Sequence, residues 1–282
     1  MVFVSLVTGA SSGLGRVLAE LLCEKGHRVY IVARRKNLLE ELKKQCKDLK
    51  GEIIIISGDI SEGNFREKLI SQILKKEKRI DYLFNNAGFG RSIIFEKQNK
   101  KEIEDMFRVN IIAYEHLANL VLPYMKKTNS GRIINTGSVV AFTPLPYFTA
   151  YNSTKSAVYS FNRSLRYELK DSKVTTTVVL PARMKTGFAE NAYNCYKEKG
   201  RNMCIEEFNK IAESPYVVAR NIIKNIDKGK EVITPTFRAK IWYLTRYFGF
   251  VVDFAMKYIL GPKEKKHLEQ AALKENYKSY FI

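Results

Sequence analysis

The sequence has no long hydrophobic run. No stretch of about eighteen or more apolar residues is free of charge, so we expect no membrane-spanning helix. The first residues, MVFVSLVTGASSG, have no basic n-region and continue directly into a glycine loop, so we expect no secretory signal. At 282 residues, 45% of them hydrophobic, the chain has room for one large α/β domain or two small ones.

Cysteine and histidine are scarce, which argues against two further classes of protein. The four cysteines form no CxxC pair, and so few of them in a chain of this length do not make a disulfide scaffold. We therefore expect reduced thiols and a cytoplasmic protein, with membrane association as an alternative. The three histidines are scattered, so we predict no metal site. These residues are Cys23, Cys46, Cys195, Cys204, His27, His116 and His267.

Acidic residues are too few to balance the basic ones. Lysine and arginine number 48 and aspartate and glutamate 29, a net charge of +19. Such a balance suggests an anionic partner, namely a nucleic acid, an acidic membrane surface or a phosphorylated ligand. Biased composition is the alternative, because the basic residues are spread along the chain. The sequence shows no basic recognition helix and no stacking platform, so we expect no nucleic-acid partner.

Short β-rich runs alternate with helical patterns over much of the chain. The runs are continuously apolar, which is typical of parallel strands covered by helices on both faces. This pattern predicts a doubly wound, Rossmann-type sheet. Strands are expected over residues 2–9, 27–34, 52–60, 80–88, 131–138 and 173–182, with 231–235 as a candidate final strand. Helices are expected over 15–26, 37–50, 64–79 and 100–127, the last with a break near Val109, and from Tyr151 onward.

The first expected strand ends in a glycine-rich loop, TGASSGLG, over residues 8–15. Glycines at positions 9, 13 and 15 let the chain turn sharply and bring backbone N–H groups close to a diphosphate. The N-terminus of the following helix adds a partial positive charge. A position between a strand and a helix is the context that a dinucleotide site requires, so we predict such a site. A tight turn without a ligand is the structural alternative.

A tyrosine and a lysine lie four residues apart in YNSTK, Tyr151 to Lys155, on one face of the expected helix. The spacing alone is weak, because both residue types are common. However, TGASSGLG, NNAG (residues 85–88), a serine thirteen residues before the tyrosine, and YNSTK occur in this order. Over residues 2–190 the chain therefore resembles the classical short-chain dehydrogenase/reductase family. The resemblance implies a doubly wound sheet that binds NAD(H) or NADP(H), and a homodimer or homotetramer.

The resemblance also implies four catalytic residues. Reduction of a ketone by hydride needs a proton for the developing alkoxide, but a free tyrosine has a pKa of about 10. The Lys155 ammonium, one helical turn from Tyr151, is expected to lower the pKa of Tyr151 and to reach the ribose hydroxyls. Ser138 is expected to hold the substrate oxygen against Tyr151, and Asn110 to help hold a water beside Lys155.

Two arginines stand where the second expected strand ends, in VARRK. NAD-preferring sites place an acidic residue there, whereas arginine can form two hydrogen bonds with a 2′-phosphate. We therefore predict NADP(H) rather than NAD(H), with Arg34 as the contact; two solvated arginines are the alternative. By resemblance, Asp59 and Ile60 lie by the adenine. The expected cofactor-binding residues are Gly9, Ser11, Ser12, Gly13, Leu14, Gly15, Arg34, Asp59, Ile60, Asn86, Ala87, Gly88, Tyr151, Lys155, Pro181 and Thr186.

The loop after the sixth expected strand departs from the family pattern PGxxxT. It reads PARMKT, so Ala182 replaces a glycine. If the backbone needs a positive φ there, alanine would be strained, although Thr186 can still offer its hydroxyl to the carboxamide. The irregular segment over about residues 185–215 is expected to cover the site.

The end of the chain is apolar and aromatic over residues 241–260, IWYLTRYFGFVVDFAMKYIL. If this segment is one helix, Arg246, Asp253 and Lys257 share one narrow polar stripe and the rest of the surface must be buried. It would cover a lipid-like substrate, pack on its own domain or a second subunit, or lie in a membrane interface. We predict a dinucleotide-binding and catalytic domain over 1–235 and an apolar, basic helical extension over 236–282.

The combined prediction is an NADP(H)-dependent oxidoreductase that interconverts a ketone and a secondary alcohol on an apolar substrate, such as an acyl chain or a steroid. A non-catalytic protein that senses dinucleotides or binds a membrane surface on the same scaffold is the alternative. Such a protein usually carries a substituted Tyr, Lys or Ser, and none is substituted here.

Overall fold

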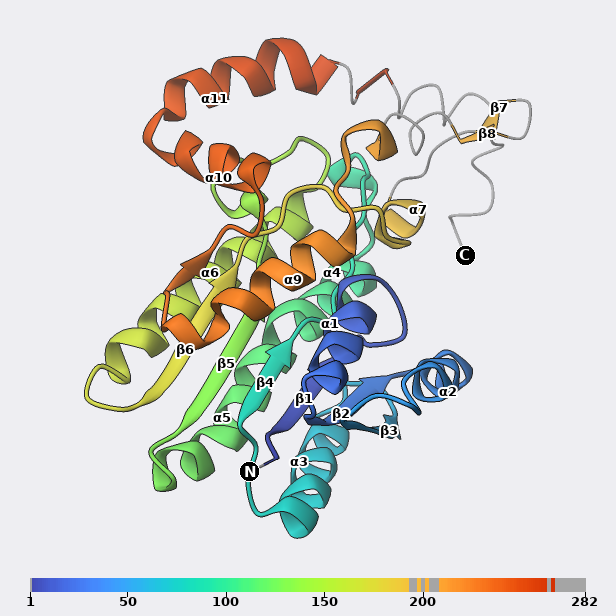
Figure 1. Ribbon diagram of the computed structural model, residues 1–282. Helices are drawn as coiled ribbons and strands as arrows, with labels where there is room; N and C mark the ends of the chain where they lie inside the picture. The colour runs from blue at the N-terminus through green and yellow to red at the C-terminus, as the bar shows by residue number, and fades with distance from the viewer. Residues whose placement is uncertain (1, 193–196, 199–200, 203–207, 263–264, 267–282) are drawn as a thin grey trace.

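Seven parallel strands form the central sheet of the molecule (Figure 1). The computed structural model describes residues 2–192, 197–198, 201–202, 208–262 and 265–266. The strand order is β3-β2-β1-β4-β5-β6-β9, so the order reverses between β1 and β4, where ligands of such sheets bind. The strands are β1 (Val4–Thr8), β2 (Arg28–Ala33), β3 (Glu52–Ser57), β4 (Tyr82–Asn85), β5 (Gly131–Thr136), β6 (Val174–Val179) and β9 (Val232–Ile233). A separate antiparallel pair joins β7 (Lys197–Glu198) to β8 (Arg201–Asn202).

Helices cover both faces of the sheet, because each presents an apolar side to it. Leu22 of α1 and Ile222 of α9 lie in one core cluster, and Leu69 of α3 and Leu117 of α5 lie in another on the opposite face. The helices are α1 (Gly13–Glu24), α2 (Lys36–Gln45), α3 (Gly63–Glu77), α4 (Lys100–Phe107), α5 (Ala113–Lys127), α6 (Thr149–Glu168), α7 (Phe188–Ala192) and α9 (Pro215–Asn225). The predicted doubly wound sheet is confirmed, and β9 is the final strand that EVITP suggested.

A π-helical turn, Arg108–Ile112, separates α4 from α5. The sequence predicts a break in this place, near Val109. The wider turn carries Asn110 into the protein, where its side chain is fully buried. Turns of this kind are frequent at functional sites, and this one lies beside the carboxyl end of β4.

Between β9 and residue 262, the described chain forms two helices rather than one. Helix α10 (Phe237–Leu244) runs into a 3₁₀ turn, and α11 (Gly249–Ala255) runs into a π-helical turn, Met256–Leu260. Between them Phe248 leaves the helical conformation, with φ −125° and ψ 49°. The condition of one continuous helix, on which the shared polar stripe depended, is therefore not met, whereas the helical character of the extension is confirmed. Figure 1 shows α10 and α11 at one end of the molecule.

The predicted boundary after residue 235 falls between β9 and α10, and the division into two parts stays a prediction. Helix α10 packs on the main body through Ala239, Trp242 and Tyr243, which share a cluster with Phe142 and Tyr159. Within the described ranges, no helix combines the length and the apolar character needed to cross a bilayer.

Candidate active site

The glycine-rich loop joins β1 to α1 at the carboxyl edge of the sheet. Gly9 has φ +69° and Gly13 has φ +58°, a conformation that residues with side chains rarely adopt. A Cβ on Gly9 would lie 2.7 Å from the Ala87 Cα, so the loop also needs the close approach that glycine permits. Helix α1 begins at Gly13, and the side chain of its N-cap, Ser12, forms no capping hydrogen bond. The first N–H groups of α1 are thus available to the diphosphate of a dinucleotide, and the loop fits this group.

Thr8 and Asn86 tie the ends of β1 and β4 together at the reversal of strand order. The Thr8 Oγ1 accepts hydrogen bonds from the backbone N–H groups of Asn86, at 2.9 Å, and Ala87, at 3.1 Å. The Asn86 amide donates to the Thr8 carbonyl oxygen at 3.0 Å. These bonds hold the NNAG segment beside the glycine loop, which explains why two motifs 70 residues or more apart in sequence form one edge.

The two arginines after β2 differ in their contacts. Arg34 is mostly exposed, and its guanidinium lies 3.6 Å from the Asp59 carboxylate. Arg35 donates hydrogen bonds to the hydroxyls of Ser11 and Ser12 in the glycine loop, both at 2.9 Å. The sequence interpretation named Arg34 alone, although VARRK contains both residues. The structure therefore adds Arg35 to the candidate contacts of a 2′-phosphate.

One cavity of about 870 Å³ runs along the carboxyl edge of the sheet from the glycine loop to α10. All predicted catalytic and cofactor-binding residues line it except Gly15 and Asn110. A Cβ on Gly15 would lie 2.6 Å from the Gly9 carbonyl oxygen, so Gly15 serves the packing of α1 against the loop. A volume of this size lies within the range of about 300–1,000 Å³ for small-molecule sites.

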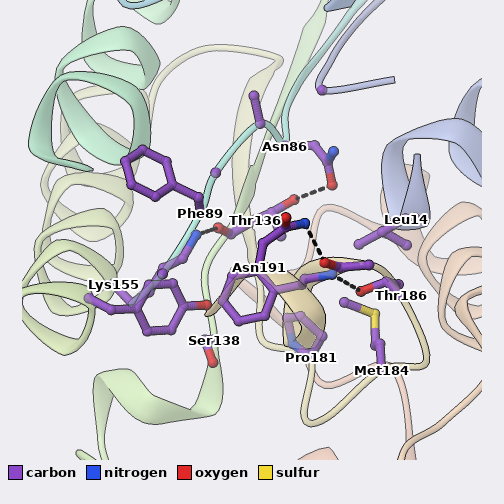
Figure 2. Close-up of a pocket in the computed structure, with 18 of the residues that line it drawn as sticks. Leu14, Asn86, Phe89, Thr136, Ser138, Lys155, Pro181, Met184, Thr186 and Asn191 are labelled. Atoms are coloured by element: carbon purple, nitrogen blue, oxygen red, sulfur yellow. Dashed lines mark hydrogen bonds between the residues drawn. The ribbon is translucent and has the colours of Figure 1, made fainter. Parts of the chain in front are cut away.

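Ser138, Tyr151 and Lys155 meet in the middle of this cavity. Ser138 follows β5, and its side chain lines the cavity together with that of Tyr151 on α6. The Lys155 Nζ lies 5.7 Å from the centroid of the Tyr151 ring and donates a hydrogen bond to the Thr136 carbonyl oxygen at 2.8 Å. Figure 2 shows Lys155 and Ser138 on one side of the cavity and Leu14, Met184 and Thr186 on the other.

Burial dominates the ionisation of this pair. It raises the pKa of Tyr151 above its usual value, and the hydrogen bond from Ser138 opposes this only in part. Burial also lowers the pKa of Lys155 to about 7. The expectation that the Lys155 ammonium lowers the pKa of Tyr151 is not met, because desolvation favours the neutral form of both groups. At neutral pH the tyrosine therefore carries its proton.

Asn110 supports the site from behind. Its amide donates to the Phe89 carbonyl oxygen at 2.9 Å and to the Thr154 hydroxyl at 3.1 Å, and its carbonyl oxygen accepts from the Phe89 N–H at 3.1 Å. A Cβ on Gly88 would lie 3.0 Å from the Asn110 Oδ1 and 3.6 Å from the Lys155 Nζ. The Asn110 side chain therefore fixes the segment after β4 through Phe89, and it does not itself line the cavity.

Apolar residues surround the outer half of the cavity. The ring centroids of Phe188 and Phe148 lie 5.4 and 6.1 Å from that of Tyr151. Trp242 of α10 lines the same space. The sequence suggests residues 241–260, which include Trp242, as a segment that could cover a lipid-like substrate, but it singles out neither Phe148 nor Phe188, since no local motif marks them. The part of residues 185–215 that includes Cys195 and Cys204 lies outside the described residues.

Ala182 is accommodated without strain. Among the described residues other than glycine, positive φ values occur at Lys78, Asn129 and Tyr147. Ala182 therefore does not need the conformation that glycine favours. Thr186 lines the cavity, and its hydroxyl accepts a hydrogen bond from the Phe188 N–H at 3.3 Å (Figure 2).

Comparisons with known proteins agree with this geometry. Residues 4–196 match the short chain dehydrogenase family. The chain is 29% identical over 270 residues to 11-beta-hydroxysteroid dehydrogenase-like 2 of Arabidopsis thaliana, covering 95% of this chain and 84% of that protein. It is 30% identical over 188 residues to 3-ketodihydrosphingosine reductase of Bacteroides thetaiotaomicron, covering 67% and 66%. A solved short-chain dehydrogenase from Sphingobium yanoikuyae, in complex with NADPH, superposes with a TM-score of 0.75 at 26% identity, covering 89% of this chain and 95% of that one.

A doubly wound sheet with a glycine loop at its switch point is the architecture of dinucleotide-binding oxidoreductases. The family match covers more than half of the sequence and includes the loop, Ser138 and the Tyr151–Lys155 pair. The chain belongs to the short-chain dehydrogenase/reductase family.

Proposed function

We propose that this protein is an NADP(H)-dependent oxidoreductase that interconverts a ketone and a secondary alcohol on an apolar substrate. The observation that carries the proposal is the continuous cavity. It joins the glycine loop to Ser138, Tyr151 and Lys155 and then to an apolar half. A cofactor in the first part and a substrate in the second would meet at the Tyr151 hydroxyl.

The protein's own residues would handle the proton and the substrate oxygen. When bound, the nicotinamide supplies or accepts the hydride. Tyr151 holds a proton at neutral pH because burial raises its pKa, so it can donate to a developing alkoxide. Ser138, which lines the cavity with Tyr151, can donate a second hydrogen bond to the same oxygen. These roles suit carbonyl reduction.

Lys155 would complete this arrangement through its charge. With a pKa of about 7, its amine exchanges a proton near neutral pH. The ammonium form, with its Nζ 5.7 Å from the centroid of the Tyr151 ring, would stabilise the phenolate that remains after proton donation. The hydrogen bond to Thr136 keeps the amine in this position. Asn110 is a positioning residue in this scheme, because its contacts are with Phe89 and Thr154.

The preference for NADP(H) is inferred from the positive charges of Arg34 and Arg35 and from the lack of an acidic residue at the end of β2. Ala33 ends β2, where an acidic residue would repel a 2′-phosphate. Arg34 and Arg35 both line the cavity, and Arg35 already lies over the hydroxyls of the glycine loop. The NADPH complex of the Sphingobium relative supports the same choice.

The apolar substrate is inferred from the lining and from the relatives. Phe148 and Phe188 place phenyl rings beside Tyr151, and Trp242 adds the large apolar surface of an indole ring to the same cavity. The relatives reported above are named as an 11-beta-hydroxysteroid dehydrogenase-like protein and a 3-ketodihydrosphingosine reductase. Both names refer to a hydroxyl or keto group on a large, mostly apolar molecule. We infer a ketone of this kind.

Equilibrium binding of NADPH and NADH to the purified protein tests the proposal. We expect NADPH to bind more tightly, and Arg34→Asp and Arg35→Asp to weaken NADPH binding by about 10- to 100-fold each. Arg220→Asp, on the exposed face of α9, is the matched control and should bind as the wild type does. Tighter binding of NADH would overturn the cofactor preference and leave the enzyme class in place. Binding of neither nucleotide would overturn the proposed function.

A further inference from the structure

The C-terminal helices expose more large apolar side chains than any other stretch of similar length among the described residues. We call this surface the tail face. Its members are 45–79% exposed. They are Phe237, Ile241, Leu244, Tyr247, Phe248, Phe250, Val251, Phe254, Tyr258 and Ile259.

Helix α10 is apolar on two sides. Ala239, Trp242 and Tyr243 face the body of the protein and pack in its core. Ile241 and Leu244 are exposed, at a spacing that places them side by side on the other face. A surface helix of a soluble protein normally has one apolar side and one polar side. The second apolar side of α10 therefore indicates a second partner.

Helix α11 repeats the pattern more strongly. Phe250 and Phe254 lie one turn apart on α11, and the ring centroid of Tyr258, in the π-helical turn that follows, lies 5.0 Å from that of Phe254. Phe250 is 79% exposed and Phe254 60% exposed. Val252 is the buried apolar residue of this helix. One buried side chain ties α11 down, while its aromatic side is open to solvent.

Basic side chains accompany the tail face. The described residues from 237 onward carry six basic residues and one acidic residue, Asp253. The Arg246 guanidinium lies 4.5 Å from the ring centroid of Tyr247, and the Lys257 Nζ lies 5.2 Å from that of Tyr258. Aromatic rings beside cations on long side chains are typical of surfaces that lie at the level of lipid headgroups. The basic residues are Arg238, Lys240, Arg246, Lys257, Lys265 and Lys266.

We propose that the tail face docks on an anionic lipid bilayer, with α10 and α11 lying in the plane of the interface. The apolar rings would enter the acyl boundary while the basic side chains meet the headgroups. The charge decides between a bilayer and a second copy of this chain. Pairing two tail faces would bring together two surfaces of the same positive sign, whereas an anionic bilayer is complementary to one.

Docking in this orientation would place the cavity at the membrane. Trp242 and Arg238 of α10 line the cavity, while Ile241 and Leu244 of the same helix belong to the tail face. The mouth of the cavity would then open beside the bilayer, and an apolar ketone could enter without crossing water. This consequence rests on the proposed function; the docking itself does not.

Vesicle sedimentation with the full-length protein tests the docking. The vesicles are neutral phosphatidylcholine, or phosphatidylcholine with about a third of anionic phosphatidylglycerol. The test variant is Phe250→Ser/Phe254→Ser, because neither residue lines the cavity. The matched control is Tyr124→Ser/Tyr167→Ser, two exposed rings near the ends of α5 and α6, at the opposite edge of the sheet. Light scattering in detergent-free buffer reports the oligomeric state of each protein.

We expect wild type and control to sediment with the anionic vesicles and much less with the neutral ones. The test variant should bind the anionic vesicles at least about tenfold more weakly. Equal binding of test variant and wild type, or no binding of the wild type, would overturn the proposal. A change from dimer to monomer in the test variant without vesicle binding would assign the tail face to a second copy instead. NADPH binding by the same proteins separates this outcome from a failure of the proposed function.

Discussion

The sheet and the C-terminal helices are both rich in apolar residues. The sheet buries these residues, whereas the C-terminal helices expose most of theirs to solvent. Strand β4 is buried along its length, whereas in α10 and α11 only Ala239 and Val252 are buried. A parallel strand must be followed by a crossover, and the crossover helix covers the strand face. Helices α10 and α11 follow the last strand of the described chain, so no later crossover within it requires their outer sides to be covered. Apolar composition therefore does not by itself locate a core.

Burial also separates the lysines of these regions. Lys155 is enclosed at the end of the sheet, where desolvation lowers its pKa to about 7. Lys240 and Lys257 on the C-terminal helices are exposed. The same residue type would serve proton transfer in one region and attraction of an anionic surface in the other. Burial of the side chain therefore decides which of the two roles a lysine can take.

The largest effect is expected at the enclosed site. Tyr151→Phe should lower turnover of an apolar ketone by about 10²- to 10⁴-fold, because the proton donor is removed. NADPH affinity should change little, since the ring is kept. Tyr167→Phe, on the same helix but exposed, is the control. Steady-state kinetics would contradict the proposed role if Tyr151→Phe kept more than about a tenth of the wild-type turnover.

Two alanine substitutions, one in the sheet and one in the tail face, compare how much each region contributes to the free energy of unfolding. Leu83→Ala in β4 should lower the free energy of unfolding by about 2–5 kcal/mol, because a fully buried side chain leaves a cavity. Phe250→Ala should change it by no more than about 0.5 kcal/mol in lipid-free buffer, because its ring is 79% exposed. Urea denaturation measures both. A comparable loss in the two variants would mean that the tail face is already covered in solution.

A smaller, pH-dependent effect is expected at Lys155. Its folded-state pKa is about 7, below the usual 10.5, so the unfolded chain binds more protons between these values. The lysine's contribution to stability is fully present above pH 10.5 and is lost as the pH falls towards 7. Lys155→Met should therefore be more stable relative to wild type at pH 7 than at pH 9.5, by about 1–3 kcal/mol.

Urea denaturation at the two pH values measures this difference. Exposed Lys170→Met is the control and should show none. The same relative stability of Lys155→Met at both pH values would show that Lys155 stays charged in the folded protein.

Local motifs predicted much of the site. The glycine loop, Ser138, Tyr151 and Lys155 were identified from their spacing and their resemblance to a family, and the structure brings them to one cavity. The contact of Arg35 with Ser11 joins two separate loops, so the motif VARRK does not reveal it. No motif surrounds Phe148 and Phe188, and their role depends on where distant segments fold.

Continuous apolar strands and glycine turns are local properties, so the doubly wound sheet and the order of its motifs follow from the sequence. The dominance of burial over the charge of Lys155 in setting the pKa of Tyr151 follows from the fold. The break of the C-terminal segment at Phe248 and the exposure of its aromatic side also follow from the fold. Both results depend on which surfaces face water, and that is set by contacts between residues far apart in the chain.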